Sequence, residues 1–112
     1  IMNQTATHPI AVTQDQFEQE VINSDKPVLI DFWAEWCAPC RAVAPIMEAL
    51  SQDYEGRAKV VKLDVDSNQQ IAMQYGIRSI PTVMVFDKGQ VVDSLIGVQP
   101  KAAYEQSLDK VV

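Results

Sequence analysis

The stretch Asp31-Phe32-Trp33-Ala34-Glu35-Trp36-Cys37-Ala38-Pro39-Cys40 carries both cysteines of the chain and ends an apolar run. Residues 28–34 are apolar except for Asp31, which predicts a central strand buried on both faces of a sheet. Beyond Cys37 apolar residues recur at helical spacing, so a helix is expected to begin there. The two cysteines therefore lie where a buried strand turns into a helix.

Strand and helix patterns alternate on both sides of this stretch. The expected strands are residues 10–12, 28–34, 58–65, 82–86 and 91–96, and the expected helices are residues 14–23, 37–54, 67–75 and 100–111. Thr13 and Gln16 form a capping box before the first helix, and Pro45 predicts a kink in the second. A turn at residues 87–90, with Gly89 suited to positive φ, predicts a closing hairpin. The order βαβαβαββα predicts an α/β fold with a mixed central sheet covered on both faces.

Length and charge narrow the class of protein. The chain has 112 residues, which favours one domain, and its net charge of −6 argues against nucleic acid or an anionic membrane as the main partner. The longest apolar run is far shorter than the roughly 20 residues of a membrane span, and the start lacks the features of a signal peptide. We therefore expect a cytoplasmic monomer; a signal removed by processing stays an open alternative. Residues 1–9 are interpreted as a short extension in which Ile1-Met2 resembles a cloning remnant, and residues 10–112 as the domain.

The C-x-x-C spacing of Cys37 and Cys40 predicts redox chemistry. Residues three apart at the start of a helix share one face, so a disulfide closes with little backbone movement. Cys37 is expected at the helix N-terminus, where free N–H groups favour a thiolate, and Cys40 nearer the core. We predict that Cys37 attacks a target disulfide and that Cys40 resolves the mixed disulfide. Pro39 stiffens the loop, and the small Ala38 leaves it open to a large partner.

The alternative to redox chemistry is half of a metal site. A structural zinc site needs four ligands, but the chain has no third cysteine and its one histidine, His8, lies in the N-terminal segment. We therefore expect no metal and no cofactor besides the redox-active disulfide.

Asp31 interrupts an otherwise apolar strand six residues before Cys37. A buried carboxyl needs a partner or has a raised pKa, and beneath the resolving cysteine it would act as general base for Cys40. The alternative is a carboxylate at a sheet edge that reaches solvent. Lys62 on the neighbouring strand is either the charge partner of Asp31 or a solvated lysine at a strand end.

Two aromatic residues and one proline complete the candidate site. Trp33 belongs to the strand and is expected in the core, whereas Trp36 lies in the turn, where a large exposed aromatic indicates a docking surface. Pro81 opens a strand after Ile80; on statistics alone an X-Pro bond is cis in about 5–6% of cases.

Several motifs in register resemble the thioredoxin family. The stretch from Asp31 to Cys40 resembles its active-site signature, and Tyr75-Gly76-Ile77-Arg78-Ser79-Ile80-Pro81-Thr82 resembles its cis-proline loop. Lys62-Leu63-Asp64-Val65-Asp66 is similar to its third strand, and Phe86, Gly89 and Gly97 fall where the family has Phe, Gly and Gly. The similarity runs from about Ile10 to the end of the chain.

The resemblance implies a five-stranded mixed sheet flanked by four helices and the reduction of protein disulfides, with regeneration by a thioredoxin reductase. It implies Cys37 as nucleophile, Cys40 as resolving thiol, Asp31 as buried acid/base, Lys62 as its partner, and a cis Pro81 against the disulfide. The residues expected to contact disulfide-containing targets are Trp36, Ala38, Pro39, Ile80, Gly97 and Val98.

Two residues depart from the family pattern. Ala38 stands where the family usually has Gly, which bears on redox poise or partner preference, and Arg41 replaces the commoner Lys but keeps its charge. The alternative hypotheses for the function are an exported oxidant, a reductant dedicated to one partner, or a binding module with incidental redox chemistry. The absence of a signal pattern and the joint presence of Cys37, Cys40, Asp31 and Pro81 favour the general reductase.

Overall fold

The computed structural model describes residues 7–112, so the expectation for Ile1-Met2 lies outside the described residues. The elements follow one another as β1 (Ile10–Ala11), η1 (Glu18–Ile22), β2 (Val28–Trp33), α1 (Ala38–Asp53), β3 (Lys59–Asp64), α2 (Gln69–Gln74), β4 (Thr82–Asp87), β5 (Gln90–Ile96) and α3 (Lys101–Asp109). The predicted order of strands and helices is confirmed, and α1 continues across Pro45.

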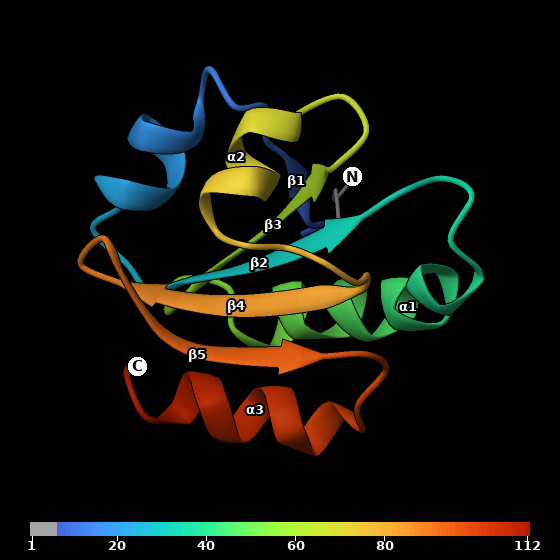
Figure 1. Ribbon diagram of the computed structural model, residues 1–112. Helices are drawn as coiled ribbons and strands as arrows, with labels where there is room; N and C mark the ends of the chain where they lie inside the picture. The colour runs from blue at the N-terminus through green and yellow to red at the C-terminus, as the bar shows by residue number, and fades with distance from the viewer. Residues whose placement is uncertain (1–6) are drawn as a thin grey trace, which may run out of the picture.

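The five strands form one mixed sheet in the order β1-β3-β2-β4-β5 (Figure 1). β3 is parallel to β1 and β2, whereas β4 is antiparallel to β2 and to β5. β2 therefore lies in the middle, and its first five residues are buried. The predicted mixed sheet with a doubly buried central strand is confirmed.

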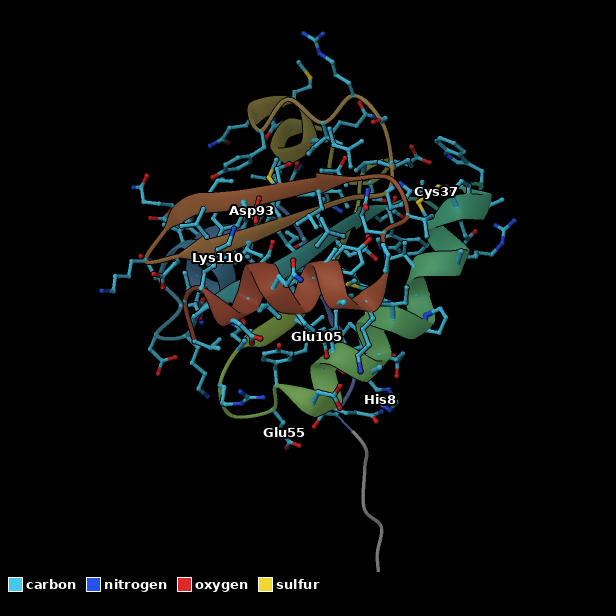
Figure 2. The ribbon with its side chains drawn as sticks, turned by 90° about the horizontal axis from the view of Figure 1, so that it is seen from below. His8, Cys37, Glu55, Asp93, Glu105 and Lys110 are labelled. Atoms are coloured by element: carbon cyan, nitrogen blue, oxygen red, sulfur yellow. A yellow bond between two sulfur atoms is a disulfide. The ribbon has the colours of Figure 1, made fainter. Side chains whose placement is uncertain are left out.

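Helices cover both faces of the sheet. Figure 1 shows α1 and α3 on one face and η1 and α2 on the other. Each face has its own apolar cluster. The first is built mainly by Leu29, Val43, Met47, Leu50, Val83, Tyr104 and Leu108, and the second by Phe17, Val21, Ile30, Phe32, Ile71 and Phe86. Asp93 of β5 ties α3 to the sheet, because it accepts hydrogen bonds from Ser107 Oγ and from Lys110 Nζ. Figure 2 labels Asp93 and Lys110.

The closing hairpin turns at Lys88 and Gly89, which have φ of 54° and 81°. Positive φ at both central residues is the geometry of a type I′ turn, whose twist matches that of the flanking strands. A Cβ at position 89 would lie 3.2 Å from Ile22 Cγ2 and from the Ile22 carbonyl oxygen. Both backbone conformation and close packing therefore require the glycine.

The first helical segment differs from the prediction. Instead of an α-helix over residues 14–23, η1 is a π-helical turn in which the Asn23 N–H bonds to the Glu18 carbonyl at 2.9 Å. The Glu20 carbonyl, which an α-helix would offer to Ser24, accepts a hydrogen bond from Lys59 Nζ at 2.6 Å. This contact from β3 competes with the local helical pattern. The predicted capping box is half confirmed, because the Thr13 N–H donates to Gln16 Oε1 at 3.1 Å.

Candidate active site

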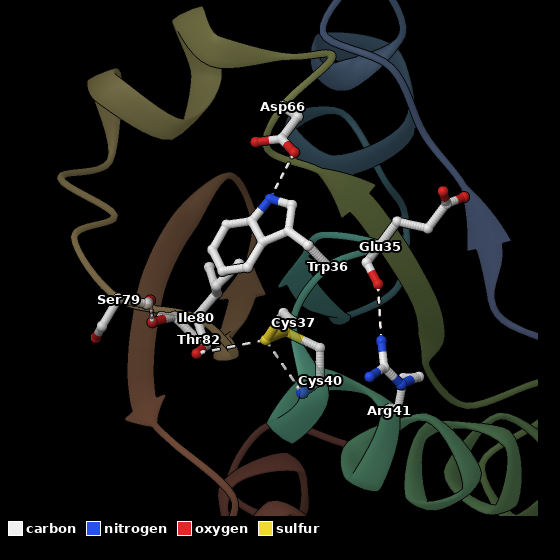
Figure 3. The surroundings of a disulfide bond; sticks show 9 residues. All are labelled: Glu35, Trp36, Cys37, Cys40, Arg41, Asp66, Ser79, Ile80 and Thr82. Atoms are coloured by element: carbon white, nitrogen blue, oxygen red, sulfur yellow. Dashed lines mark hydrogen bonds between the residues drawn. A yellow bond between two sulfur atoms is a disulfide. The ribbon is translucent and has the colours of Figure 1, made fainter.

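Cys37 and Cys40 form a disulfide at the N-terminal end of α1, with their Cα atoms 5.3 Å apart. Cys37 is the N-cap residue, with φ −90° and ψ 106°, and its Sγ accepts a hydrogen bond from the Cys40 N–H at 3.2 Å (Figure 3). The helix begins at Ala38, and Pro39 occupies its first turn, where a missing N–H costs nothing. The positive end of the helix thus points at the sulfur of Cys37, which stabilises a thiolate there.

The two cysteines are buried to the same degree, with exposed fractions of 3% for Cys37 and 4% for Cys40. Exposure does not distinguish the two cysteines, although Cys40 lies inside the first turn of α1, as predicted. Their surroundings differ instead. Cys37 Sγ lies 3.7 Å from the Ile80 carbonyl oxygen, whereas Cys40 lines a cavity that also contains Asp31. The helix end and the neighbouring groups, not exposure, distinguish the two thiols.

Asp31 lies in the middle of β2, paired with Lys62 of β3 on one side and with Val83 of β4 on the other. It is only 5% exposed, which excludes a solvated carboxylate at a sheet edge. Within the described residues, Asp31 Oδ1 is the one buried side-chain oxygen or nitrogen without a hydrogen-bond partner. Burial raises the pKa of Asp31 from 3.8 to about 7, although the charge of Lys62 acts in the opposite direction. The site thus holds a carboxyl that exchanges its proton near neutral pH.

The Asp31 cavity has a volume of about 130 Å³. Asp31, Cys40, Trp33 and Lys62 line it, together with Pro9, Arg41, Ala44, Met47 and Glu48. A water molecule occupies about 30 Å³ of liquid, so the Asp31 cavity has room for more than one. The carboxyl and the second cysteine therefore share one small space.

Lys62 stands beside Asp31 in the sheet but forms no ion pair with it within 4.0 Å, as far as residues 7–112 show. Its Nζ lies 5.3 Å from the centre of the Trp33 ring. Trp33 itself is half-buried rather than a full core residue, because its side chain faces the Asp31 cavity. Lys62 therefore acts on Asp31 through its charge, not through contact.

The loop before β4 lies against the disulfide. The Ile80-Pro81 bond is cis, as expected from the resemblance. The loop is fixed by a hydrogen bond from Thr82 Oγ1 to the Ser79 carbonyl at 2.7 Å (Figure 3). Pro81 accepts a hydrogen bond from the Gly97 N–H at 2.8 Å, which brings Gly97 into the site, and Ile80 packs against the cysteine pair.

Trp36 is 68% exposed, and a hydrogen bond orients its indole. Its Nε1 donates a hydrogen bond to Asp66 Oδ2 at 2.7 Å, and Arg41 Nη1 donates to the Glu35 carbonyl at 2.8 Å (Figure 3). Sequence reasoning missed Asp66 as a site residue, although it ends the motif quoted for the third strand. Trp36 thus presents an exposed aromatic surface whose orientation Asp66 favours.

A groove of about 440 Å³ runs from Trp36 and Ile80 to helix α2. We call it the α2 groove; its lining residues are Trp36, Val65, Asp66, Gln69, Ala72, Met73, Ile77, Arg78, Ser79 and Ile80. The other predicted contact residues lie outside it: Ala38 and Pro39 are exposed, and Val98 is 47% exposed beside Gly97. The contribution of α2 was not predicted, because the sequence pattern assigned that helix no role beyond the fold.

Within residues 7–112 no three His, Cys, Asp or Glu side chains gather closely enough to hold a metal ion. His8 instead bonds through Nδ1 to Glu48 Oε1 at 2.5 Å. No helix in this described part has the length and apolar character that crossing a membrane requires.

Comparison with known proteins agrees with this geometry. The family model described as Thioredoxin matches residues 8–110. Thioredoxin 1 of Nostoc sp. is 57% identical over 99 residues, which are 88% of this chain and 92% of that protein. Thioredoxin of Porphyra purpurea is 54% identical over 101 residues, covering 90% and 94% of the two chains.

A redox-active cysteine pair at a helix N-terminus on this α/β sheet defines a thiol–disulfide oxidoreductase that reduces protein disulfides. More particularly, the match over nearly all of the sequence shows that the chain belongs to the thioredoxin family. Proteins of this family work on disulfide-containing targets and are returned to the dithiol form by a thioredoxin reductase.

Proposed function

We propose that the chain is a general reductant of protein disulfides in which Cys37 attacks, Cys40 resolves and Asp31 handles the proton of Cys40. The observation that supports this assignment is that the two sulfur atoms have different surroundings. The Cys40 N–H points at Cys37 Sγ from the start of α1, while Cys40 itself shares the Asp31 cavity.

The reaction starts from the dithiol. The Cys37 thiolate attacks one sulfur of a target disulfide, forms a mixed disulfide and releases the other target sulfur as a thiolate that takes up a proton. Cys40 loses its proton and attacks Cys37 Sγ, which releases the second target thiol and closes the Cys37–Cys40 disulfide. Two electrons pass from the chain to the target, and a reductase must return them.

Asp31 is the proposed base for the second step. With a pKa of about 7, the carboxyl of Asp31 is partly ionised at neutral pH, so it can accept the proton of the Cys40 thiol there. Because Asp31 and Cys40 line the same cavity, which has room for water, the proton can pass between them through that cavity. Lys62 would tune this base by its charge.

Targets are proposed to lie across the surface formed by Trp36, Ile80, Gly97 and Val98, next to the exposed Ala38 and Pro39. An extended target segment would pair with the backbone beside Pro81. We further infer that residues 10–112 form the catalytic domain, that it works as a monomer in the cytoplasm without a cofactor, and that a thioredoxin reductase is its electron donor.

The test is reduction of insulin by dithiothreitol, followed by the precipitation of the freed chains. The wild type is expected to accelerate the reaction, and Cys37→Ser to abolish the acceleration. Cys40→Ser, reduced first and then freed of dithiothreitol before insulin is added, is expected to accumulate a mixed disulfide on Cys37, which mass spectrometry of the unreduced protein detects. Reduction that persists without Cys37, or trapping on Cys40 in Cys37→Ser, would refute the assigned order.

A further inference from the structure

We propose that Met73 is an oxidation site. Peroxides that oxidise it weaken the docking of targets, while Cys37 and Cys40 keep their ability to reduce disulfides. The inference rests on the proposed function, because Trp36 and Ile80 of the proposed target surface also line the α2 groove, and it extends that surface along the groove to Met73. Its chemistry requires a thioether that is accessible to an oxidant and a place where a polar group would disturb an apolar contact.

Met73 is 80% exposed, the largest exposed fraction among the exposed large apolar residues of the described chain. Met47 and Met84, the other methionines within residues 7–112, are 2% and 8% exposed and belong to the two apolar clusters. A peroxide in solution therefore reaches the side chain of Met73 far more readily than the side chains of Met47 and Met84.

Met73 also lines the α2 groove, together with the exposed ring of Trp36 and with Ile80 next to the cysteine pair. Unbranched methionine adapts its shape to different apolar partners, which suits a surface that accepts many target segments. It is not part of the cysteine pair and does not line the Asp31 cavity. A change at Met73 therefore acts on docking and leaves the proton and electron transfers alone.

The modification is a two-electron oxidation of the thioether. The sulfur of Met73 attacks one oxygen of hydrogen peroxide, the O–O bond breaks, and the products are methionine sulfoxide and water. The sulfur is oxidised and the peroxide is reduced. The sulfoxide is polar and has to be desolvated when an apolar target segment covers it, so docking weakens.

The experiment compares each protein with itself before and after peroxide. The disulfide form is treated with hydrogen peroxide, the peroxide is removed, and peptide mapping by mass spectrometry locates added oxygen. KM and kcat for insulin are then measured with dithiothreitol as reductant. Met73→Leu lacks the exposed thioether, and Met84→Leu is the matched control because it removes a buried one. Met73→Gln imitates the polarity of the sulfoxide without peroxide.

The expected result is one added oxygen on Met73, none on Met47, Met84 or Trp36, and a rise of about fivefold in KM, equivalent to about 1 kcal/mol, with kcat unchanged. Met84→Leu is expected to respond in the same way, Met73→Leu to keep its KM after peroxide, and Met73→Gln to have a raised KM before any treatment. An unmodified Met73, an unchanged KM after modification, or an equal response of Met73→Leu would overturn the inference. Failure of the untreated wild type to reduce insulin would instead overturn the proposed function, and this inference with it.

Discussion

Asp31→Asn should remove most of the difference in stability between weakly acidic and weakly alkaline solution. Asp31 is buried in β2, and its Oδ1 has no hydrogen-bond partner among the described residues. Folding therefore favours the protonated carboxyl. Asparagine has nearly the same shape and never ionises, so whatever its amide costs in the core is the same at every pH.

The sign follows from the direction of the pKa shift. Folding raises the pKa of Asp31 from 3.8 to about 7, so between these values the folded chain holds a proton that the unfolded chain has released. The free energy of unfolding falls as pH rises through this window, and the loss is complete above the folded pKa. A shift of about 3 units at about 1.4 kcal/mol each amounts to about 4 kcal/mol, of which about 2.5 kcal/mol falls between about pH 5 and about pH 8.

The assay is urea unfolding of the oxidised protein, in which both variants keep the same disulfide. The free energy of unfolding is measured at about pH 5 and about pH 8 for the wild type and for Asp31→Asn, and subtracting the two proteins removes every group that they share. Asp15→Asn is the control, because it deletes an exposed carboxylate and should keep the wild-type difference. If the wild type and Asp31→Asn change in parallel between the two pH values, the raised pKa and the base assigned to it are refuted.

Three further changes test separate parts of the structure. Lys62→Met removes the charge that lowers the pKa of Asp31, so the pH profile of insulin reduction should move to higher pH; an unmoved profile would exclude Lys62 as the tuning residue. Asp66→Ala removes the acceptor of the Trp36 indole N–H, so KM for insulin should rise roughly twofold to fivefold at constant kcat in steady-state kinetics. A fall in kcat alone would contradict a docking role for Trp36. Lys88→Asn should stabilise the hairpin by about 0.5 kcal/mol and Gly89→Ala should destabilise it by about 1–2 kcal/mol in urea unfolding, because both positions have positive φ; a destabilising Lys88→Asn or a neutral Gly89→Ala would contradict the turn geometry.

Features that depend on neighbouring residues were predictable from the sequence. The apolar run of β2, the C-x-x-C at the start of α1 and the turn at Lys88 and Gly89 each have a local signal, and the structure has each in its expected place. The cis bond at Pro81 had no such signal in its own residues and followed only from the family resemblance.

Features that depend on distant contacts were not predictable. Lys59, which bonds to a carbonyl of η1 and competes with its α-helical pattern, is 39 residues away in the sequence from its partner. Asp66, which accepts the hydrogen bond of the Trp36 indole, is 30 residues away from Trp36. The Asp31 cavity is closed by residues from the N-terminal segment, α1 and the strands, so its size and its contact with Cys40 exist only in the folded chain. The apolar run around Asp31 favoured its burial but left a sheet-edge carboxylate open, and it could not show which atoms Asp31 faces.

The wall that Pro9 contributes to the Asp31 cavity has a practical consequence for attaching this protein to a resin, an electrode or a fusion partner. The segment is anchored on α1, where Ser51 Oγ donates to the Thr7 carbonyl at 3.0 Å, so an attachment that strains this segment would disturb the side of the cavity that Pro9 lines. Val112 lies at the opposite end of the molecule from the first turn of α1 (Figure 1). Immobilisation through Val112 therefore leaves the sulfur-bearing end facing the solution and keeps the N-terminal wall undisturbed.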